Sequence, residues 1–241
     1  MAIFYGIYDN TSVWSIDTVN KTTSEVVSSG VIGNTANALA IDPSRIQVFF
    51  IGVGGVEYWA YATNTVQSVG GASLGLINEP NNAAFYNNAL WYFDHDTDVL
   101  CQATLSYTGS GGTAVPSIVG VTNYQILNMD HTNPVNTNSF GDIAIDRNNG
   151  ILYAYTSRGR FYSVDLSDPS NTFSEIQQSF GDIRTVGLQL TFDDLSANLY
   201  GTNYTTGNWY KINAANGSLT EIYGLVTFSS ETGTGFRDLG G

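Results

Sequence analysis

Short runs of alternating hydrophobic and polar residues fill this chain. Apolar residues keep the 3.6-residue period of a helix over no long stretch, and Gly, Asn, Asp and Ser interrupt the sequence about every eight to twelve residues. Alternation with a period of two puts successive side chains on opposite faces of a strand. The pattern therefore predicts an all-β chain of many short strands joined by turns.

One strand pattern recurs along the chain. It runs polar, apolar, aromatic, polar, β-branched, then Asp or Asn, and it occurs at 12–17, 160–165 and 208–213, and more loosely at 57–60 and 100–103. Other strands precede and follow it in the same order: a strand that ends in Asp, an apolar-aromatic-small strand, and a polar last strand. Four strands per repeat is typical of a β-propeller blade.

The spacing of the repeats predicts their number. Corresponding positions are Trp14, Tyr58, Cys101, Tyr162 and Tyr210, at intervals of 44, 43, 61 and 48 residues. The distance from the last of these through the end of the chain and back to the first is 45 residues, again one repeat. We therefore expect one β-propeller domain over residues 1–241, with about five four-stranded blades.

The two ends of the sequence complement each other. The chain begins at the second strand of a blade, at 3–8, and a segment that suits the missing first strand lies at 235–239. Pairing of the two segments would remove both open sheet edges. The sequence thus predicts a ring closed by a C-terminal strand that joins the N-terminal blade.

Two resemblances follow from these residues. The segments Gly141–Asp146 and Gly150–Ala154 resemble the repeats of NHL, senescence-marker-protein and YncE-type propellers. That resemblance implies a propeller fold and no particular activity, because such propellers include lyases, lactonases and scaffolds. The Asn/Thr/Gly/Tyr-rich composition with few lysines resembles that of bacteriophage structural proteins, which implies a virion component.

Charge narrows the range of partners. Eight Lys and Arg stand against 21 Asp and Glu, for a net charge of −13. Such a chain repels phosphate backbones and anionic lipid, so we expect neither a nucleic-acid nor a membrane partner. The N-terminal residues lack the basic and apolar regions of a signal peptide, and no run is long enough to span a bilayer. The virion, or otherwise the cytoplasm, is the expected location.

The densest polar cluster, Asp94–Asp98, could offer oxygens to Ca²⁺, but the residues after it do not continue an EF-hand loop. We interpret the cluster as a hairpin turn. The recurring Asp42, Asp146 and Asp193 are interpreted as caps of the turns that follow them. Cys101 has apolar neighbours and is predicted to be a buried, inert thiol.

Propeller enzymes usually place carboxylates, His or Arg on the first strands around the channel, whereas the comparable positions here are a mixed set with a single carboxylate: Ala38, Ala83, Asp142 and Gln189. There are only two histidines, and no nucleophile or phosphate-loop motif. We therefore predict a protein that is not an enzyme, with no cofactor and no metal.

The third repeat is the long one, and its surplus residues are placed around 121–139. Extra loop on a rigid scaffold is where recognition is usually built. The predicted partner-binding residues are Tyr124, Ile126, Leu127, Met129 and His131. The alternative is a loop that packs over its own blade.

The leading functional hypothesis is a non-catalytic protein-binding or structural propeller, with virion proteins among its expected partners. Two alternatives stay open. Tyr and Trp for stacking, with Asn and Asp for hydrogen bonds, also suit a lectin-like carbohydrate-binding propeller, although no sugar motif repeats in all blades. The third is a metal-dependent hydrolase or lactonase that acts in the channel.

Overall fold

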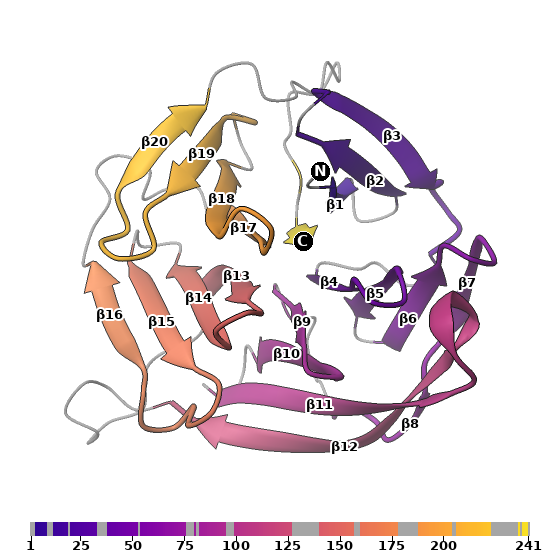
Figure 1. Ribbon diagram of the computed structural model, residues 1–241. Coiled ribbons are helices and arrows are strands. Elements are labelled where there is room, and N and C mark those ends of the chain that lie inside the picture. The colour runs from indigo at the N-terminus through magenta and orange to yellow at the C-terminus, as the bar shows by residue number, and fades with distance from the viewer. Residues whose placement is uncertain are drawn as a thin grey trace.

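The structure is a computed structural model, and Figure 1 shows it along the axis of a ring of five sheets. The described residues are 3–8, 12–18, 20–32, 38–52, 54–75, 80, 82–94, 99–126, 140–156, 160–177, 188–203, 206–222, 236 and 238–240. Each sheet is a blade whose first strand lies nearest the axis. The prediction of an all-β, five-bladed propeller is confirmed.

The strands of each blade are given from the axis outward. The first blade has β21 (Asp238–Gly240), β1 (Ile3–Tyr8), β2 (Ser12–Asp17) and β3 (Thr22–Val27). The second has β4 (Ala38–Asp42), β5 (Gln47–Gly52), β6 (Gly55–Ala60) and β7 (Thr65–Ser68). The third has β9 (Ala84–Tyr86), β10 (Ala89–Asp94), β11 (Val99–Thr108) and β12 (Val115–Gln125), with β8 (Gly70–Gly71) at its outer edge. The fourth has β13 (Phe140–Asp146), β14 (Ile151–Thr156), β15 (Phe161–Asp165) and β16 (Ser174–Gln177). The fifth has β17 (Leu188–Asp193), β18 (Asn198–Asn203), β19 (Trp209–Ile212) and β20 (Leu219–Ile222).

Burial falls from the axis outward. Every residue of β5 is buried, whereas β7, the last strand of the same blade, is exposed or half-buried throughout. An inner strand has a neighbouring blade on both faces, so it needs a continuous apolar run, while an outer strand meets water. This explains why the inner strands are the more apolar and the outer strands the more polar.

Aromatic rings join neighbouring blades. Phe49 of the second blade stacks on Phe85 of the third with ring centroids 6.0 Å apart, and Tyr153 of the fourth stacks on Phe192 of the fifth at 6.1 Å. Such rings bury large apolar areas and prefer offset or tilted contacts. The core of the molecule is therefore a set of blade-to-blade contacts around the ring.

The ring closes as predicted. β21 pairs with β1 in antiparallel fashion, with Gly6 opposite Leu239. A Cβ atom on Gly6 would lie 2.3 Å from the ring of Phe236, so only glycine lets the two chain ends approach so closely. The first blade is thus built from both ends of the chain.

The long third repeat differs from its prediction. Its surplus was placed at 121–139, but residues 121–125 belong to β12. Part of the extra length lies instead in a ribbon of β11 and β12, which have 10 and 11 residues, and the short 3-10 helix η1 (Gly111–Thr113) joins them. The ribbon extends toward the second blade (Figure 1), where β12 pairs in parallel with β8. The added strand β8, which follows the second blade in the chain and pairs with β12 of the third, is encoded by no repeat pattern and accompanies this difference.

Candidate functional site

Three corresponding turns lie at one end of the ring, and each begins with an aspartate. The Ser44 N–H donates to Asp42 Oδ1 at 2.9 Å, and Asn148 and Leu195 make the same bond to Asp146 and Asp193, each at 3.1 Å. A carboxylate that accepts from the backbone two residues on holds a turn closed. The interpretation of these aspartates as turn caps is confirmed.

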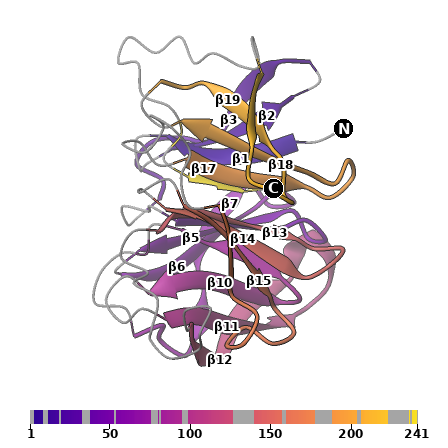
Figure 2. The same cartoon turned by 90° about the vertical axis from the view of Figure 1, so that its left-hand side faces the viewer.

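A pocket of about 460 Å³ opens among these turns, and we call it the mouth pocket. It is lined by the start of β1, the ends of β4 and β17, and the turns that follow β4, β13 and β17. In the side view, the start of the described chain and the turn after β17 lie at the same end of the ring (Figure 2). A volume of this size is typical of a ligand site.

The rim of the mouth pocket is aliphatic and exposed. Ile3, Ile46 and Leu195 leave 46%, 42% and 79% of their surface accessible, and all three line this one pocket. Single exposed aliphatic residues are ordinary, but a group of them around a hollow marks an interaction site. The arrangement is suited to holding an apolar group.

Ile46 stands in a backbone conformation that disfavours it. Its φ is +52°, in the left-handed region, at the position where the corresponding turns have Gly150 and Ala197 at +68° and +52°. That region costs an ordinary residue about 1–2 kcal/mol, and it is rarer still for a β-branched residue. Strain of this kind is concentrated at functional sites.

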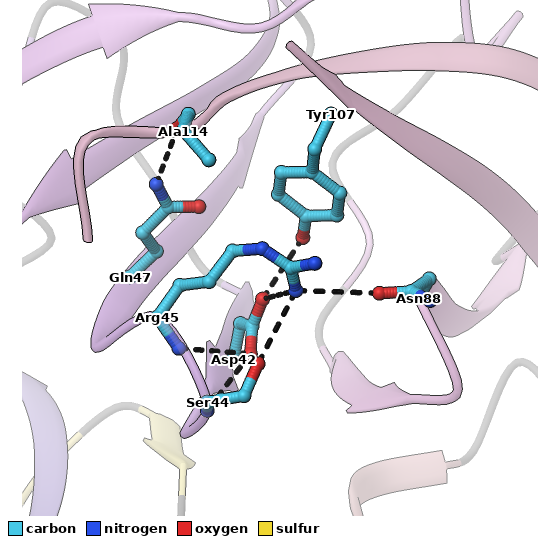
Figure 3. Close-up of polar contacts among 7 residues, drawn as sticks. All are labelled: Asp42, Ser44, Arg45, Gln47, Asn88, Tyr107 and Ala114. Carbon is cyan, nitrogen blue, oxygen red and sulfur yellow. Dashed lines mark hydrogen bonds and ion pairs between the residues drawn. The ribbon is translucent and has the colours of Figure 1, made fainter. Parts of the chain in front are cut away.

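A network of polar side chains fixes the turn that carries Ile46 (Figure 3). The Asp42 carboxylate is fully buried, and its Oδ2 accepts from Arg45 Nη1 at 2.6 Å and from Tyr107 Oη at 3.1 Å. The Arg45 guanidinium lies 3.6 Å from the centre of the Tyr107 ring and donates to Asn88 Oδ1. Because Tyr107 and Asn88 belong to the third blade, this network joins two blades.

Two further features belong to this contact between the second and third blades. Gln47 is fully buried, and its Nε2 donates to the Ala114 carbonyl of the ribbon at 2.6 Å. Burial, and next the charge of Asp42, raises the pKa of Tyr107, while Arg45 offsets part of that rise. The phenol therefore stays protonated and keeps donating at neutral pH.

The charges at the mouth pocket are unevenly matched. Arg147, in the turn after β13, forms an ion pair with Asp194, and its backbone N–H donates to the same carboxylate at 3.1 Å. Asp193 has no cationic partner among the described residues; it accepts from the Leu195 N–H and from Ser196 Oγ. The pocket thus holds one carboxylate that no described cation neutralises.

The channel on the ring axis is nearly closed. First strands from all five blades line a space of about 20 Å³, with small residues such as Ala40 and Gly240 among them. A space of this size holds about one water molecule. The buried Asp142 carboxylate accepts from the backbone N–H groups of Ile143 and Leu190, which ties the fourth blade to the fifth.

Only two of the five predicted partner-binding residues lie within the described part of the chain. Tyr124 lies in β12, where its ring stacks on Trp91 and its hydroxyl donates to Gln102 Oε1 at 2.8 Å. Ile126 is fully buried in the core. The other three, Leu127, Met129 and His131, lie outside the described residues, and the role of the set in binding stays a prediction.

Two other predictions concern single features. Asp94 is the last residue of β10 and faces Val99 of β11, while 95–98 lie outside the described residues. Cys101 is 3% exposed, and burial raises the pKa of its thiol to about 12, so the prediction of a buried thiol is confirmed.

Sequence reasoning missed the mouth pocket. Its rim residues come from positions 3, 46 and 195, which no single motif contains. One signal was present: the fourth residue after the capping aspartate of each corresponding turn is Ile46, Gly150 or Ala197. A bulky residue at a position where glycine fits best marks this turn as unusual.

Comparison with known proteins gives a fold and no family. No family model and no curated protein matches the sequence. Among solved structures 862 chains match, so the architecture is widely used. One is from a nidogen/laminin complex, with a TM-score of 0.60 and 12% identity, covering 99% of this chain and 97% of that chain.

Two other similar structures have names that refer to enzymes. A streptogramin B lyase has a TM-score of 0.50 and 12% identity, covering 91% of this chain and 68% of that chain. A 6-phosphogluconolactonase candidate from Bacteroides uniformis has a TM-score of 0.52 and 10% identity, covering 91% and 80%. Propellers with these names differ in function, and such low identities establish the fold alone. This chain is therefore a five-bladed β-propeller.

Proposed function

We propose that this propeller is a non-catalytic protein-binding module, and that its docking face is the end of the ring that carries the mouth pocket. The observation that carries the proposal is the convergence of Ile3, Ile46 and Leu195 on one pocket of about 460 Å³. A closed ring holds these side chains in fixed positions, so little ordering is needed when a partner binds.

The character of the pocket favours a protein over a carbohydrate. Its exposed rim is aliphatic, whereas sugars stack on aromatic faces. Trp59, Trp91 and Trp209 are each at most 3% exposed, so these three rings are buried in the core and do not offer a face to a sugar. A lectin-like function would have to rely on other aromatic residues.

Two observations support a function without catalysis. Within the described residues, no group of three or more His, Cys, Asp or Glu side chains is placed to hold a metal ion. The space between the first strands, at about 20 Å³, is too small for a substrate, and the Asp142 carboxylate there accepts from backbone N–H groups. Both weaken the alternative of a hydrolase or lactonase that works in the channel.

The virion role rests on composition alone and stays part of the proposal. The net charge of −13 disfavours nucleic acid as a partner, and no helix in the described part of the chain is long and apolar enough to cross a membrane. Gene neighbourhood and virion proteomics test the role: capsid and tail neighbours support it, and a metabolic operon contradicts it.

The docking face is tested by affinity capture from the native source with two matched variants. The double variant Ile46→Ser/Leu195→Ser alters the pocket rim, and Val115→Ser/Val119→Ser alters two exposed aliphatic residues of β12. We expect a protein that the wild type and the β12 variant retain and that the rim variant loses. Equal retention by both variants would show that the mouth pocket is not the docking face.

A third variant separates the two candidate surfaces. Replacing 127–139 with a short Gly-containing turn removes the loop residues that the sequence suggested. If this variant alone loses the partner, the loop is the contact and the mouth pocket is not.

A further inference from the structure

The mouth pocket has an apolar floor as well as an apolar rim. Phe4, Ile41 and Phe192 line it and are 2%, 5% and 4% exposed. A side chain that passes the rim therefore meets apolar atoms at the bottom. Burying a large apolar side chain in such a place removes its surface from water and favours binding.

The electrostatics of the pocket favour a cation at its entrance. Arg147 is already paired with Asp194, so among the described lining residues the carboxylate of Asp193 is the charge without an ionic partner. Hydrogen bonds from Leu195 and Ser196 hold that carboxylate in place. The net charge of −13 adds attraction for a cation and repulsion for an anion.

Ile46 provides an independent indication of what the pocket selects. Its turn would form with less strain if it carried glycine, as the turn after β13 does, yet it places a branched aliphatic side chain on the rim. Folding alone gives no reason for that choice, whereas contact with an apolar group does.

We infer that the mouth pocket holds an apolar side chain of a partner segment with a Lys or Arg beside it, that Ile46 selects the apolar part, and that Asp193 selects the cation. This inference rests on the proposed protein-binding function and specifies what the partner must present. Aliphatic contact supplies affinity, and the carboxylate supplies discrimination.

The test uses two small probes that share a phenyl group and differ in charge, 2-phenylethylammonium and 3-phenylpropionate. Each is titrated into the intact chain while the methyl resonances of Ile3, Ile46 and Leu195 are followed by NMR. We expect the ammonium probe to shift these methyls with an affinity about tenfold higher than the carboxylate probe, and salt to narrow the difference.

Variants assign the two roles. Asp193→Asn keeps an oxygen that can accept from Leu195 and should bring the two probes to similar affinity. Ile46→Ala and Ile46→Gly should weaken both probes equally, although the glycine variant relieves strain that the alanine variant keeps. If Ile46 acted on folding alone, the probe affinities of the alanine and glycine variants should instead differ from each other. Val119→Ala, at an exposed strand position outside the pocket, is the control.

Two results would overturn the inference. If 3-phenylpropionate binds as tightly as the ammonium probe, the assignment of a cation is wrong. If neither probe shifts the rim methyl resonances at any concentration up to its solubility limit, the assignment of an apolar side chain is wrong as well. The capture experiment on the rim variant is read out separately, so the docking face can stand when the ligand assignment fails.

Discussion

The turn between β4 and β5 and the turn between β13 and β14 occupy corresponding places in their blades, and both begin with a buried aspartate. Asp42 accepts from the backbone of Ser44, and Asp146 accepts from that of Asn148. Each turn also carries an arginine that contacts the next blade, through Tyr107 in one case and Asp194 in the other. Local chemistry and position in the ring are thus alike.

The two turns differ in how they end and in how deeply they are anchored. The left-handed position is Ile46 in the first and Gly150 in the second. The first turn is anchored by the fully buried Asp42 and its network, while the ion pair beside the second turn is partly exposed. The more strongly anchored turn is therefore the one that can hold a strained residue at the mouth pocket.

The largest expected effect concerns the anchor. Asp42→Ala removes a fully buried carboxylate that binds Arg45 and Tyr107, so the free energy of unfolding should fall by about 3 kcal/mol, near the lower end for a broken buried pair. Asp146 forms hydrogen bonds but has no ion pair among the described residues, so Asp146→Ala should cost about 1 kcal/mol. Urea denaturation measures both.

Similar losses for the two alanine variants would break the comparison, because the turns would then be equally anchored. The slope of the denaturation curve serves as the control: it should stay constant if each variant unfolds as a single unit.

The anchored turns show what the sequence could predict. The strands, the count of blades and the closing strand follow from two-residue alternation and from spacing, which act along the chain. The caps follow from the chemistry of Asp42, Asp146 and Asp193. Each of these predictions needs only neighbours in sequence or a repeat length.

The mouth pocket shows where sequence reasoning ends. Its rim unites Ile3, Ile46 and Leu195, which the ring brings together from three blades. The ribbon of the third blade likewise depends on pairing between β8 and β12. Contacts of this kind are set by how the blades pack, and a single sequence holds no repeated signal for them.

The next effect concerns the glycine of the second turn. Gly150→Ala places a Cβ atom 2.9 Å from Tyr86 Oη and keeps φ at a value that disfavours alanine, so the unfolding free energy should fall by about 1–2 kcal/mol. The reverse exchange in the fifth blade, Ala197→Gly, should gain up to about 1 kcal/mol. Thermal melting compares the two, and a loss in both would contradict the assigned conformations.

A smaller effect tests the strain at Ile46. Ile46→Ala and Ile46→Gly remove the same contacts, but only glycine accepts a φ of +52° without strain, so the glycine variant should be more stable than the alanine variant by about 1 kcal/mol. At Val119, an exposed position in β12, the alanine variant should instead be more stable than the glycine variant, by about 0.5–1 kcal/mol. The same order at both positions would mean that Ile46 is not strained.

The smallest expected effect is a difference in pH dependence between two contacts, one joining the second and third blades and the other joining the fourth and fifth. Tyr107→Phe keeps the ring beneath Arg45 and removes one hydrogen bond to Asp42, so it should cost about 1 kcal/mol at neutral pH. Burial raises the pKa of Tyr107 in the folded chain, so the unfolded chain releases this proton first as pH rises above about 10. The contribution of the phenol is thus complete below that pH and falls above it.

The difference in unfolding free energy between wild type and Tyr107→Phe should therefore shrink between about pH 9 and pH 11, because the variant lacks the phenol whose proton the unfolded chain releases. Asp194→Asn, in the contact between the fourth and fifth blades, provides the comparison: it removes no phenol, so its effect should stay constant over that range. Denaturant titrations at the two pH values measure both differences. A constant cost for Tyr107→Phe would place the phenol outside the network that anchors the β4–β5 turn, and the strained rim residue would then need another support.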